Sequence, residues 1–408
     1  MADFKTVTNC RVCGSERLKK YLDLGKAPLA NALLNTPSSQ SEKYPLQVLF
    51  CEDCSLSQLS IVVKPEILYS NYPYHSSVSK TFQEHCRKMA IEIKKYFESL
   101  PGKPLVVDIA SNDGCLLEQF QLENYYVMGV EPSKNLAEES IMKGISTINE
   151  FWSEKTARRI PACDVITATN VFAHVDDLRT FLKAAKGELR VYSKGILVVE
   201  VPYLYDLISK VQFDTIYHEH LSYFLFKPLK RIFSECGLNI FNVERHEIHG
   251  GSLRVYATPY DRPINKSVKA LEAFEKKNKL YDFKTYLEFA SKVEEIRDYF
   301  VDLLQDLRRQ RKKVMAYGAS AKGAMLLNYC GVDSNQISSV VDDTKDKQGK
   351  YMPGSRIPIV DQEKLDSNKP DYIALLSWNF SDEIINKTLS HKDRGAKYII
   401  PVPTVSVL

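Results

Sequence analysis

Between residues 105 and 200, short apolar runs alternate with helical stretches, and this pattern constrains the fold more than any other feature of the chain. The runs have the length and the valine and isoleucine content of buried strands. Strands that alternate with helices of about ten to fifteen residues are typical of βαβ units, whose strands lie parallel in one sheet. The sequence therefore predicts an α/β sheet with strands at 105–109, 126–130, 165–169 and 195–200.

A second block of the same architecture follows a Lys/Glu-rich helical stretch at about 265–312. Its predicted strands cover 313–317, 337–341 and 372–376, and the turn Gly318-Ala-Ser-Ala-Lys-Gly323 follows the first of them. Backbone amides in such a turn, with Lys322, are suited to bind a diphosphate, so Lys322 is a predicted substrate contact. A dinucleotide-binding fold kept only for packing explains the same pattern.

Four of the nine cysteines form two Cys-x-x-Cys pairs, Cys10 with Cys13 and Cys51 with Cys54. Thiolates at this spacing point at one ion, and two such pairs complete a tetrahedral zinc site. Four protein ligands leave no open position, so the predicted Zn²⁺ is structural and holds together a small N-terminal domain with an insertion between the pairs. The alternative is four unrelated buried cysteines.

The 408 residues leave room for three domains, which we place at 1–75, 76–265 and 266–408. A formal net charge of +4 does not by itself indicate a nucleic-acid partner, and the basic run at 308–313 is expected to be the solvated end of a helix. No apolar run approaches the ~20 residues of a membrane span, and the N-terminus lacks the apolar core of a signal peptide. An odd number of cysteines favours a reducing, cytoplasmic setting. The sequence leaves the oligomeric state open, and a monomer is compatible with it.

The stretch Asp108-Ile-Ala-Ser-Asn-Asp-Gly114 ends the first predicted strand with an acid and a turn of small residues. Such a turn lets a ligand approach the backbone at the carboxyl end of the sheet. It lacks the Gly-x-Gly-x-x-Gly of a pyrophosphate site and suits the ammonium and sulfonium of S-adenosylmethionine (SAM) better. Glu131 closes the next strand, where a carboxylate accepts from both ribose hydroxyls. A structural turn beside a surface acid is the alternative.

Further residues are expected to line the same cleft. Asn170 follows the third strand, and Phe151 and Trp152 are placed to wall the adenine. The predicted cofactor contacts are Asp108, Ala110, Asn112, Asp113, Gly114, Glu131, Pro132, Phe151 and Asn170.

The stretch Tyr217-His218-Glu219-His220 places four groups that hold or move protons side by side. A methyltransferase that acts on an existing nucleophile needs little acid–base help, whereas one that methylates carbon must first remove a proton. A histidine is suited to be that base, and tyrosine phenols are suited to donate to the resulting enolate oxygen. Either His218 or His220 fits the role of base on the residues alone. A polar loop with satisfied histidines is the alternative.

Ten motifs occur in an order that identifies a relationship over nearly the whole chain. They are Cys10-Arg-Val-Cys-Gly14, Leu22-Asp-Leu-Gly25, Ala27-Pro-Leu29, the Cys51/Cys54 pair, Tyr72-Pro-Tyr-His-Ser-Ser77, Asn112-Asp-Gly114, Gly129-Val-Glu-Pro-Ser133, Tyr217-His-Glu-His220, His249-Gly-Gly-Ser-Leu-Arg254 and Gly318-Ala-Ser-Ala-Lys-Gly323. Together they resemble the nucleotide-sugar C-methyltransferase family. The resemblance implies a zinc-binding N-terminal domain, a central class I SAM-methyltransferase domain and a C-terminal Rossmann-like domain.

The resemblance also implies a substrate and roles for single residues. The substrate would be a nucleotide-linked 4-keto-6-deoxyhexose, carried by dTDP or GDP and methylated at C3. His220 resembles the family's proposed base, and His174 resembles a further active-site histidine. The residues that resemble its neighbours at the sugar are Tyr217, Glu219 and Tyr74, with His218 as a substrate contact. Asp108-Ile-Ala110 stands where family members often have Glu-Ile-Gly, so the site for the methionine end differs from the pattern.

Two other functions fit part of the sequence. SAM-dependent O- or N-methylation of another small molecule explains the cofactor motif but gives residues 217–220 no role. A zinc-ribbon nucleic-acid-binding protein requires a basic face interleaved with aromatic residues near the cysteine pairs, and that region carries mixed charge.

Overall fold

The predicted strands of the central block form one seven-stranded sheet, here called the central sheet. The computed structural model describes residues 3–69 and 74–408. In spatial order the strands are β12 (Asn239–His246), β13 (Ser252–Thr258), β10 (Ile196–Pro202), β9 (Val165–Thr169), β6 (Leu105–Ile109), β7 (Tyr126–Val130) and β8 (Ser146–Ile148). Five of them, β10 to β8, run parallel, and β13 is antiparallel to its neighbours β10 and β12. The chain fills one side of β6 and then crosses to β9, so a ligand cleft is expected at the carboxyl ends of these two strands.

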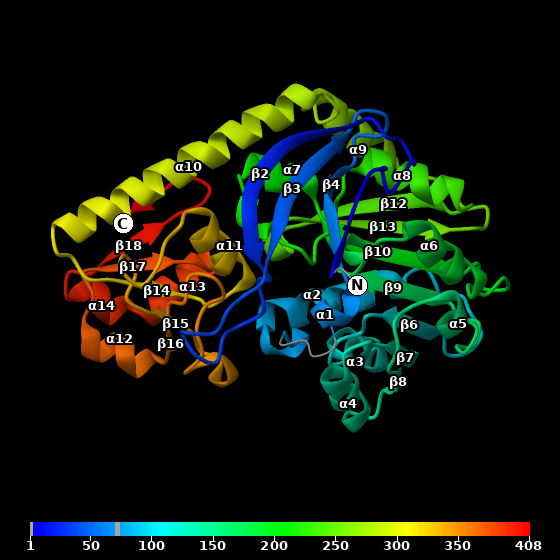
Figure 1. The fold of residues 1–408 in the computed structure, drawn as a ribbon. Coiled ribbons are helices and arrows are strands. Elements are labelled where there is room, and N and C mark those ends of the chain that lie inside the picture. The colour runs from blue at the N-terminus through cyan, green and yellow to red at the C-terminus, as the bar shows by residue number, and fades with distance from the viewer. Residues whose placement is uncertain (1–2, 70–73) are drawn as a thin grey trace.

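Helices cover both faces of this sheet (Figure 1). They are α2 (Lys80–Lys94), α3 (Cys115–Leu122), α4 (Lys134–Met142), α5 (Glu154–Ala157), α6 (Leu178–Gly187), α7 (Leu204–Ser209) and α8 (Phe226–Glu235). Helix α2 shows why such segments fold as they do, since the Ser79 side chain caps it by accepting from the Phe82 amide. Its buried residues recur every three or four positions, from Phe82 through Cys86 and Met89 to Ile93, which gives one apolar face.

The N-terminal part contributes an antiparallel sheet, here called the N-terminal sheet. Its strands, in order, are β11 (Ser222–Tyr223), β4 (Ser57–Leu59), β3 (Lys43–Cys51) and β2 (Leu18–Pro28). A separate pair joins β1 (Phe4–Thr6) to β5 (Ile61–Val63), and α1 (Pro65–Tyr69) follows. The strand β11 comes directly after the Tyr217–His220 stretch, so a segment from the middle of the chain completes this sheet.

The C-terminal block forms a six-stranded sheet, parallel except at its last strand. Its order is β16 (Ile359–Val360), β15 (Val340–Val341), β14 (Val314–Tyr317), β17 (Tyr372–Leu375), β18 (Lys397–Ile400) and β19 (Ser406–Val407). Its helices are α11 (Ala321–Tyr329), α12 (Gln362–Asn368), α13 (Ser381–Lys387) and α14 (Leu389–Asp393). The predicted strand at 337–341 is shorter than expected, since only Val340–Val341 is a strand, although the amide and the hydroxyl of Ser338 both donate to the Val314 carbonyl of β14.

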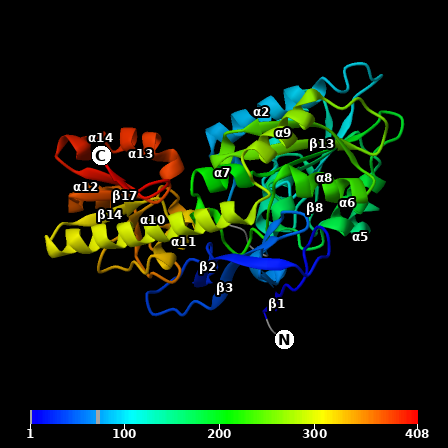
Figure 2. The ribbon, with the colours of Figure 1, turned by 90° about the horizontal axis from the view of Figure 1, so that it is seen from above.

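The helical stretch between the blocks is two helices, α9 (Lys266–Lys277) and α10 (Phe283–Arg309). Helix α10 crosses from the central block to the C-terminal sheet (Figures 1 and 2). Its Tyr286 packs against Tyr21 and Phe50 of the N-terminal sheet, with ring centroids 5.1 and 4.5 Å apart. One cluster of buried apolar residues accordingly runs from Cys10 to Val405, so the N-terminal sheet shares its core with both blocks.

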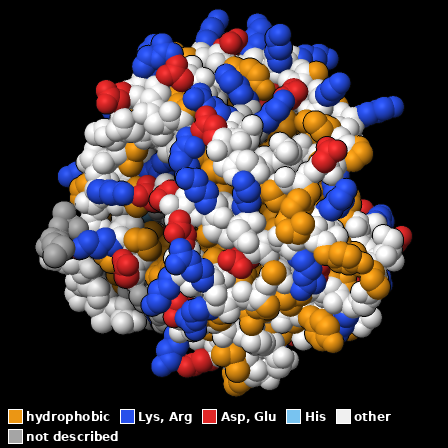
Figure 3. All heavy atoms as spheres, turned by 90° about the vertical axis from the view of Figure 1, so that its right-hand side faces the viewer, with side chains coloured by type: hydrophobic (Ala, Val, Ile, Leu, Met, Phe, Trp, Pro, Cys, Tyr) orange, Lys and Arg blue, Asp and Glu red, His pale blue; other side chains and the backbone are white. Residues whose placement is uncertain are grey.

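Two surface properties bear on partners. In the described ranges 3–69 and 74–408, none of the helices has the length and apolar content to cross a bilayer. On the face shown in Figure 3, lysine and arginine side chains are interspersed with acidic and hydrophobic ones.

Candidate active site

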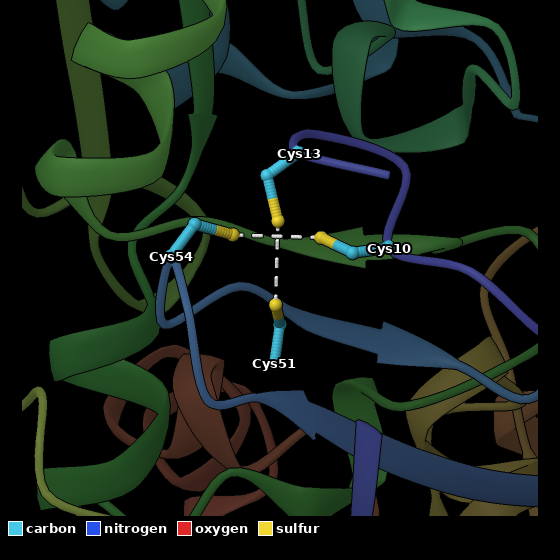
Figure 4. A group of neighbouring side chains, drawn as sticks. All are labelled: Cys10, Cys13, Cys51 and Cys54. Atoms are coloured by element: carbon cyan, nitrogen blue, oxygen red, sulfur yellow. Dashed lines mark hydrogen bonds between the residues drawn. The ribbon is translucent and has the colours of Figure 1, made fainter. Parts of the chain in front are cut away.

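The four paired cysteines meet at one point. Their sulfur atoms converge from the 10–13 turn and from the end of β3 with the turn after it (Figure 4), and all lie within 4.8 Å of one another. The Cys10 and Cys54 sulfurs are 3.4 Å apart, and those of Cys13 and Cys51 are 3.5 Å apart. A sulfur tetrahedron around Zn²⁺ has edges of about 3.8 Å, so this donor set fits a closed, structural zinc site.

The 10–13 turn also contacts the chain directly after the Tyr217–His220 stretch. It does so through Arg11, for which the sequence predicted no role. The Arg11 guanidinium donates to the Leu221 carbonyl at 2.9 Å and to Asp176 at 3.1 Å. The Leu59 amide of β4 donates to the same Leu221 carbonyl at 3.0 Å. Two donors from the N-terminal part therefore hold the backbone directly after His220.

The predicted cofactor turn has an unusual backbone. Ala110, Asn112 and Gly114 all have positive φ angles, of 57°, 53° and 83°. A Cβ on Gly114 would lie 2.6 Å from the Ile145 side chain, so only glycine fits there. Alanine in this region is strained, and such strain is concentrated at ligand sites. The turn therefore has the special backbone that the sequence predicted at this position.

Glu131 lies at the carboxyl end of β7 and is almost fully buried, with 4% of its surface exposed. Its two carboxylate oxygens accept from the amides of Asn112 and Ser133, each at 2.8 Å. Each oxygen keeps a further lone pair for a ligand hydroxyl. Burial raises the pKa of Glu131, while these two amides oppose the rise by stabilising the carboxylate.

Two further groups face the gap between β6 and β9. The Asp108 carboxyl accepts from the Thr167 hydroxyl at 2.7 Å, and burial raises its pKa to about 7. Asn170 follows β9 with a φ of 57°, and its side-chain oxygen is buried without a hydrogen-bond partner among the described residues. A buried orphan acceptor is rare unless a ligand or water completes it, so the site suits a bound amino group or hydroxyl.

The structure corrects the prediction for Asp113. Its two carboxylate oxygens accept from the amides of Ser77 and Cys115, at 3.0 and 3.3 Å, and the residue is fully buried. Asp113 therefore anchors the segment after Tyr74 to the turn and does not face the cleft. Asn112 does the same, because its side chain accepts from the Ser76 amide and donates to the Tyr74 carbonyl.

The predicted adenine wall is only partly formed. Phe151 is 42% exposed in the loop after β8, where it is open to a ligand. The Trp152 indole instead donates to the Phe181 carbonyl at 3.2 Å and packs inside the domain. Pro132 lies between Glu131 and Ser133, and its carbonyl accepts from the Asn149 side chain.

His220 lies among aromatic and imidazole rings, 4.1 Å from Tyr217 and 5.0 Å from His174 between ring centroids. Its Nδ1 donates to the Thr215 carbonyl at 2.8 Å, which leaves Nε2 with the lone pair. Burial lowers the pKa of His220 to about 4, although the bond to Thr215 opposes this, and the Lys322 cation lowers it further. His220 is thus a neutral imidazole with one free acceptor nitrogen.

His218 lies in the turn before β11, and its contacts are with other residues than these rings. Its Nε2 donates to the Pro45 carbonyl at 3.2 Å, and its ring packs on Tyr44 of the N-terminal sheet. Burial lowers its pKa to about 4. His218 thus packs between the Tyr217–His220 stretch and β3, and its Nδ1 is buried without a hydrogen-bond partner among the described residues.

The other predicted side chains come together beside His220. His174, in the 3₁₀ turn Phe172–His174, meets the Tyr69 hydroxyl at 3.1 Å through Nδ1, and burial lowers its pKa. Burial raises the pKa of Tyr74 to about 12 and raises the pKa of Tyr217 well above its usual value, so both phenols keep their protons. Residues 72–73 of the predicted Tyr72–Ser77 motif lie outside the described residues.

Glu219 has a different partner from the one expected. It is nearly fully buried, with 2% exposed, and accepts from the Asn31 side chain at 2.7 Å. Asn31 comes from the connection between β2 and β3, about 190 residues earlier in the chain. The N-terminal part therefore positions the Glu219 carboxylate, which the family resemblance implies to be a neighbour of the sugar.

Lys322 enters the same cleft from the C-terminal block. Its ammonium lies 4.9 Å from the centre of the Trp378 ring, and the Trp378 indole donates to Asp214 at 2.6 Å. Burial lowers the pKa of Lys322, and the Asp214 carboxylate opposes this. The second Asp214 oxygen is buried without a hydrogen-bond partner in the described part of the chain. The Lys322 ammonium, the Trp378 ring and the Asp214 carboxylate thus form one group of side chains near His220.

Several of these residues were missed by the sequence reasoning. They are Arg11, Asn31, Tyr69, Asp214 and Trp378. Each acts across a domain boundary or from an irregular turn, so no local pattern marks it. Arg11 and Asn31 do lie within or beside motifs of the family resemblance, which was the one available signal.

Three family models and a full-length relative match this chain. Family models match residues 10–69 as a zinc binding domain, 82–243 as a methyltransferase domain and 247–403 as a C-methyltransferase C-terminal domain. The C-methyltransferase NovU of Streptomyces niveus is 34% identical over 99% of this chain and 97% of its own.

Solved structures of lower similarity include magnesium protoporphyrin IX methyltransferase (ChlM) of Synechocystis with bound SAM, at 13% identity and a TM-score of 0.34 over 43% of this chain and 78% of that one. A SAM-dependent methyltransferase of Archaeoglobus fulgidus shows 16% identity and a TM-score of 0.35 over 43% of this chain and 94% of that one.

The central sheet, its turn and the cysteine cluster thus define a SAM-dependent methyltransferase that carries a zinc-binding domain. The full-length relative and the family model of the C-terminal domain narrow this class to C-methyltransferases. The chain belongs to the C-methyltransferase family.

The zinc site predicts about one Zn²⁺ per chain. Cys51→Ser removes a ligand, and because metal binding is coupled to folding, the N-terminal part should lose stability. Elemental analysis and thermal melts of the purified variant measure both effects. Cys330→Ser, at a buried cysteine outside the cluster, should keep its zinc. Full zinc content in Cys51→Ser would contradict this assignment.

The position of Glu131 predicts that its substitution lowers the affinity for the demethylated cofactor, S-adenosylhomocysteine (SAH). Glu131→Gln keeps the shape but removes the charge, so hydroxyls bind it more weakly, at a cost of about 2 kcal/mol in the free energy of SAH binding. Calorimetry measures this change, with Glu123→Gln, on the far side of the same domain, as the matched control. Equal affinities in the two variants would show that Glu131 does not hold the ribose.

Proposed function

We propose that the protein methylates C3 of a nucleotide-linked 4-keto-6-deoxyhexose through an enolate, with His220 as the base. Membership of the C-methyltransferase family supports methyl transfer to carbon. The observation that carries the proposal is the Nδ1 bond from His220 to Thr215, since it fixes the tautomer whose Nε2 accepts a proton. His218 also has a fixed tautomer, with its Nε2 donating to Pro45, but its ring packs on Tyr44 of the N-terminal sheet and not among the rings of Tyr217, His174 and His220.

The low pKa of His220 suits a base that must be neutral before the reaction. Proton removal creates an imidazolium and an enolate together, and their attraction in a buried site offsets the loss of hydration. Binding of the acceptor thus supplies the countercharge that the free site lacks. His174, also neutral, lies beside it at 5.0 Å between ring centroids.

The phenols of Tyr217 and Tyr74 are proposed to donate to the C4 oxygen. Their raised pKa values keep them protonated, so they remain donors as negative charge develops on that oxygen. One such preorganised donor contributes about 3 kcal/mol in other enzymes. Glu219, held by Asn31, is proposed to accept from a sugar hydroxyl.

The diphosphate is proposed to lie at the start of α11. The Ser320 side chain caps this helix by accepting from the Gly323 amide, and Lys322 supplies a positive charge. The partial positive charge of a helix N-terminus adds to that of the lysine. Trp378 lies over Lys322 and offers an aromatic face toward the same cleft. A dTDP carrier is proposed, with GDP as the alternative.

The cofactor residues fit SAM, which supplies an electrophilic methyl group when bound. Glu131 is proposed to bind the ribose, and Asn170 and Asp108 the amino-acid end, with Ala110, Asn112 and Gly114 shaping the turn. Phe151 and Pro132 are proposed to border the adenine. These assignments rest on the orphan Asn170 oxygen and on the spare lone pairs of Glu131.

Other features of the proposal concern the whole chain. We also propose the domain boundaries 1–75, 76–265 and 266–408. We propose a cytoplasmic location, which is supported by the fact that none of the nine cysteines forms a disulfide bond. O- or N-methylation of another molecule would not require the fixed tautomer of His220. The mixed charges in Figure 3 give no support to nucleic-acid binding.

The base assignment predicts a proton exchange without methylation. Wild-type protein incubated with SAH and a dTDP-linked 4-keto-6-deoxyhexose in heavy water should introduce deuterium at C3. His220→Asn should lower that rate by a factor of about 100 or more, because general bases contribute 10²–10⁴-fold. Nuclear magnetic resonance of the recovered sugar measures the exchange.

His218→Asn is the matched control and should keep most of the exchange rate, with a lower melting temperature. The ketone at C4 acidifies C5 as well as C3, so deuterium at C5 alone would contradict the proposed carbon. Exchange that survives in His220→Asn and stops in His174→Asn would assign the base to His174.

The pKa of His220 predicts the acid limb of the reaction. A base with a pKa of about 4 is blocked by its proton only below that pH, so the exchange rate should be flat from about pH 5 to 8. An ordinary histidine would give a half-maximal rate near pH 6.5. Rates of deuterium exchange at a series of pH values measure the limb, and a midpoint near 6.5 would contradict a buried base.

A further inference from the structure

His249 lies in the cleft on a strained turn. It is a non-glycine residue with a φ of 54°, at the corner Ile248–Gly250 between β12 and β13. Left-handed backbone is unfavourable for a histidine relative to ordinary helical backbone. Strain of this kind persists where the surrounding structure enforces it and is concentrated at functional sites.

The two glycines after His249 are held by side chains from the α7 region. The Gly250 carbonyl accepts from Lys210 and from Gln212, both at 2.9 Å. A Cβ on Gly251 would lie 2.3 Å from the Asp206 carboxylate carbon. These contacts hold the backbone on which His249 lies.

The imidazole has packing contacts but no internal polar partner. Its ring lies 5.3 Å from the Phe82 ring, between centroids, and the residue is half-buried. Within residues 3–69 and 74–408, no group donates to the ring or accepts from it. The nitrogens of this half-buried ring have no internal partner, so they are available to a ligand group.

The charged neighbours of the ring show which part of the cleft it faces. Burial lowers the pKa of His249 to about 4; Lys322, His85 and His220 lower it further, and Glu200 opposes this. Glu200 is already bound by Arg254 and by His85, each at 2.8 Å. Lys322 and His220 remain as the neighbours in the cleft, and both belong to the proposed acceptor site.

We propose that His249 is a further substrate-contacting residue, whose neutral imidazole donates an N–H to an oxygen of the bound keto-sugar and so orients the reacting carbon toward His220. This inference rests on the proposed function. A neutral imidazole has one donor and one acceptor nitrogen, which suits a ketone or hydroxyl oxygen better than a phosphate.

The test compares His249→Asn with His246→Asn, a nearby histidine that pairs with Glu244 at 3.4 Å. Asparagine tolerates left-handed backbone but is too short to reach the same oxygen. We expect the KM for a dTDP-linked 4-keto-6-deoxyhexose to rise about tenfold or more, as for one lost hydrogen bond to a buried group. Affinity for SAH should change less than twofold, and His246→Asn should match wild type.

A second variant separates ligand contact from packing. His249→Gly removes the backbone strain and no internal hydrogen bond, so its melting temperature should stay within about 3 °C of wild type. A larger fall would show a packing residue and overturn the inference. An unchanged KM in His249→Asn would do the same, and a parallel loss of SAH affinity would assign the ring to the cofactor.

A separate result would contradict the proposed function, independently of the role of His249. If wild-type protein neither binds dTDP nor exchanges a sugar proton, the substrate class is wrong whatever His249 does. The melting comparison needs no substrate and still decides whether the ring is a packing residue.

Discussion

The position of the Tyr217–His220 stretch depends on the pairing of β11 with β4, which joins a segment of the central block to the N-terminal sheet. Leu221, directly after His220, is held by the Leu59 amide and by the Arg11 guanidinium. Arg11 lies between two predicted zinc ligands, so the metal-bound turn supports the backbone that aims His220. A structural zinc can therefore affect the reaction without touching a substrate.

Burial, more than charge, sets the chemistry of the cleft. His174, His220 and His249 all have lowered pKa values because their rings are desolvated, so each enters the reaction neutral. The phenols of Tyr74 and Tyr217 stay protonated for the same reason. In the proposed mechanism, such a site generates charge only when the acceptor loses its proton, beside the proposed donors and Lys322.

Much of the fold could be predicted because it is local. The apolar runs at 105–109, 126–130 and 165–169 became strands with those bounds, and the paired cysteines met as expected. The place of β11 in the N-terminal sheet was missed because this strand comes from residue 222, and no local pattern indicates a partner so distant in sequence. His218 and His220 could not be separated by type, since only the tertiary partners Pro45 and Thr215 distinguish them.

Methyl transfer to a sugar carbon is the central claim, and the position of the new methyl group tests it most directly. SAM labelled with ¹³C in its methyl group would be incubated with the protein and a dTDP-linked 4-keto-6-deoxyhexose. We expect the labelled methyl protons to correlate with C2, C3 and C4 of the ring in a long-range carbon–proton spectrum, which places the methyl group on C3. A methyl signal at the chemical shift of an O-methyl or N-methyl group would contradict the enolate mechanism.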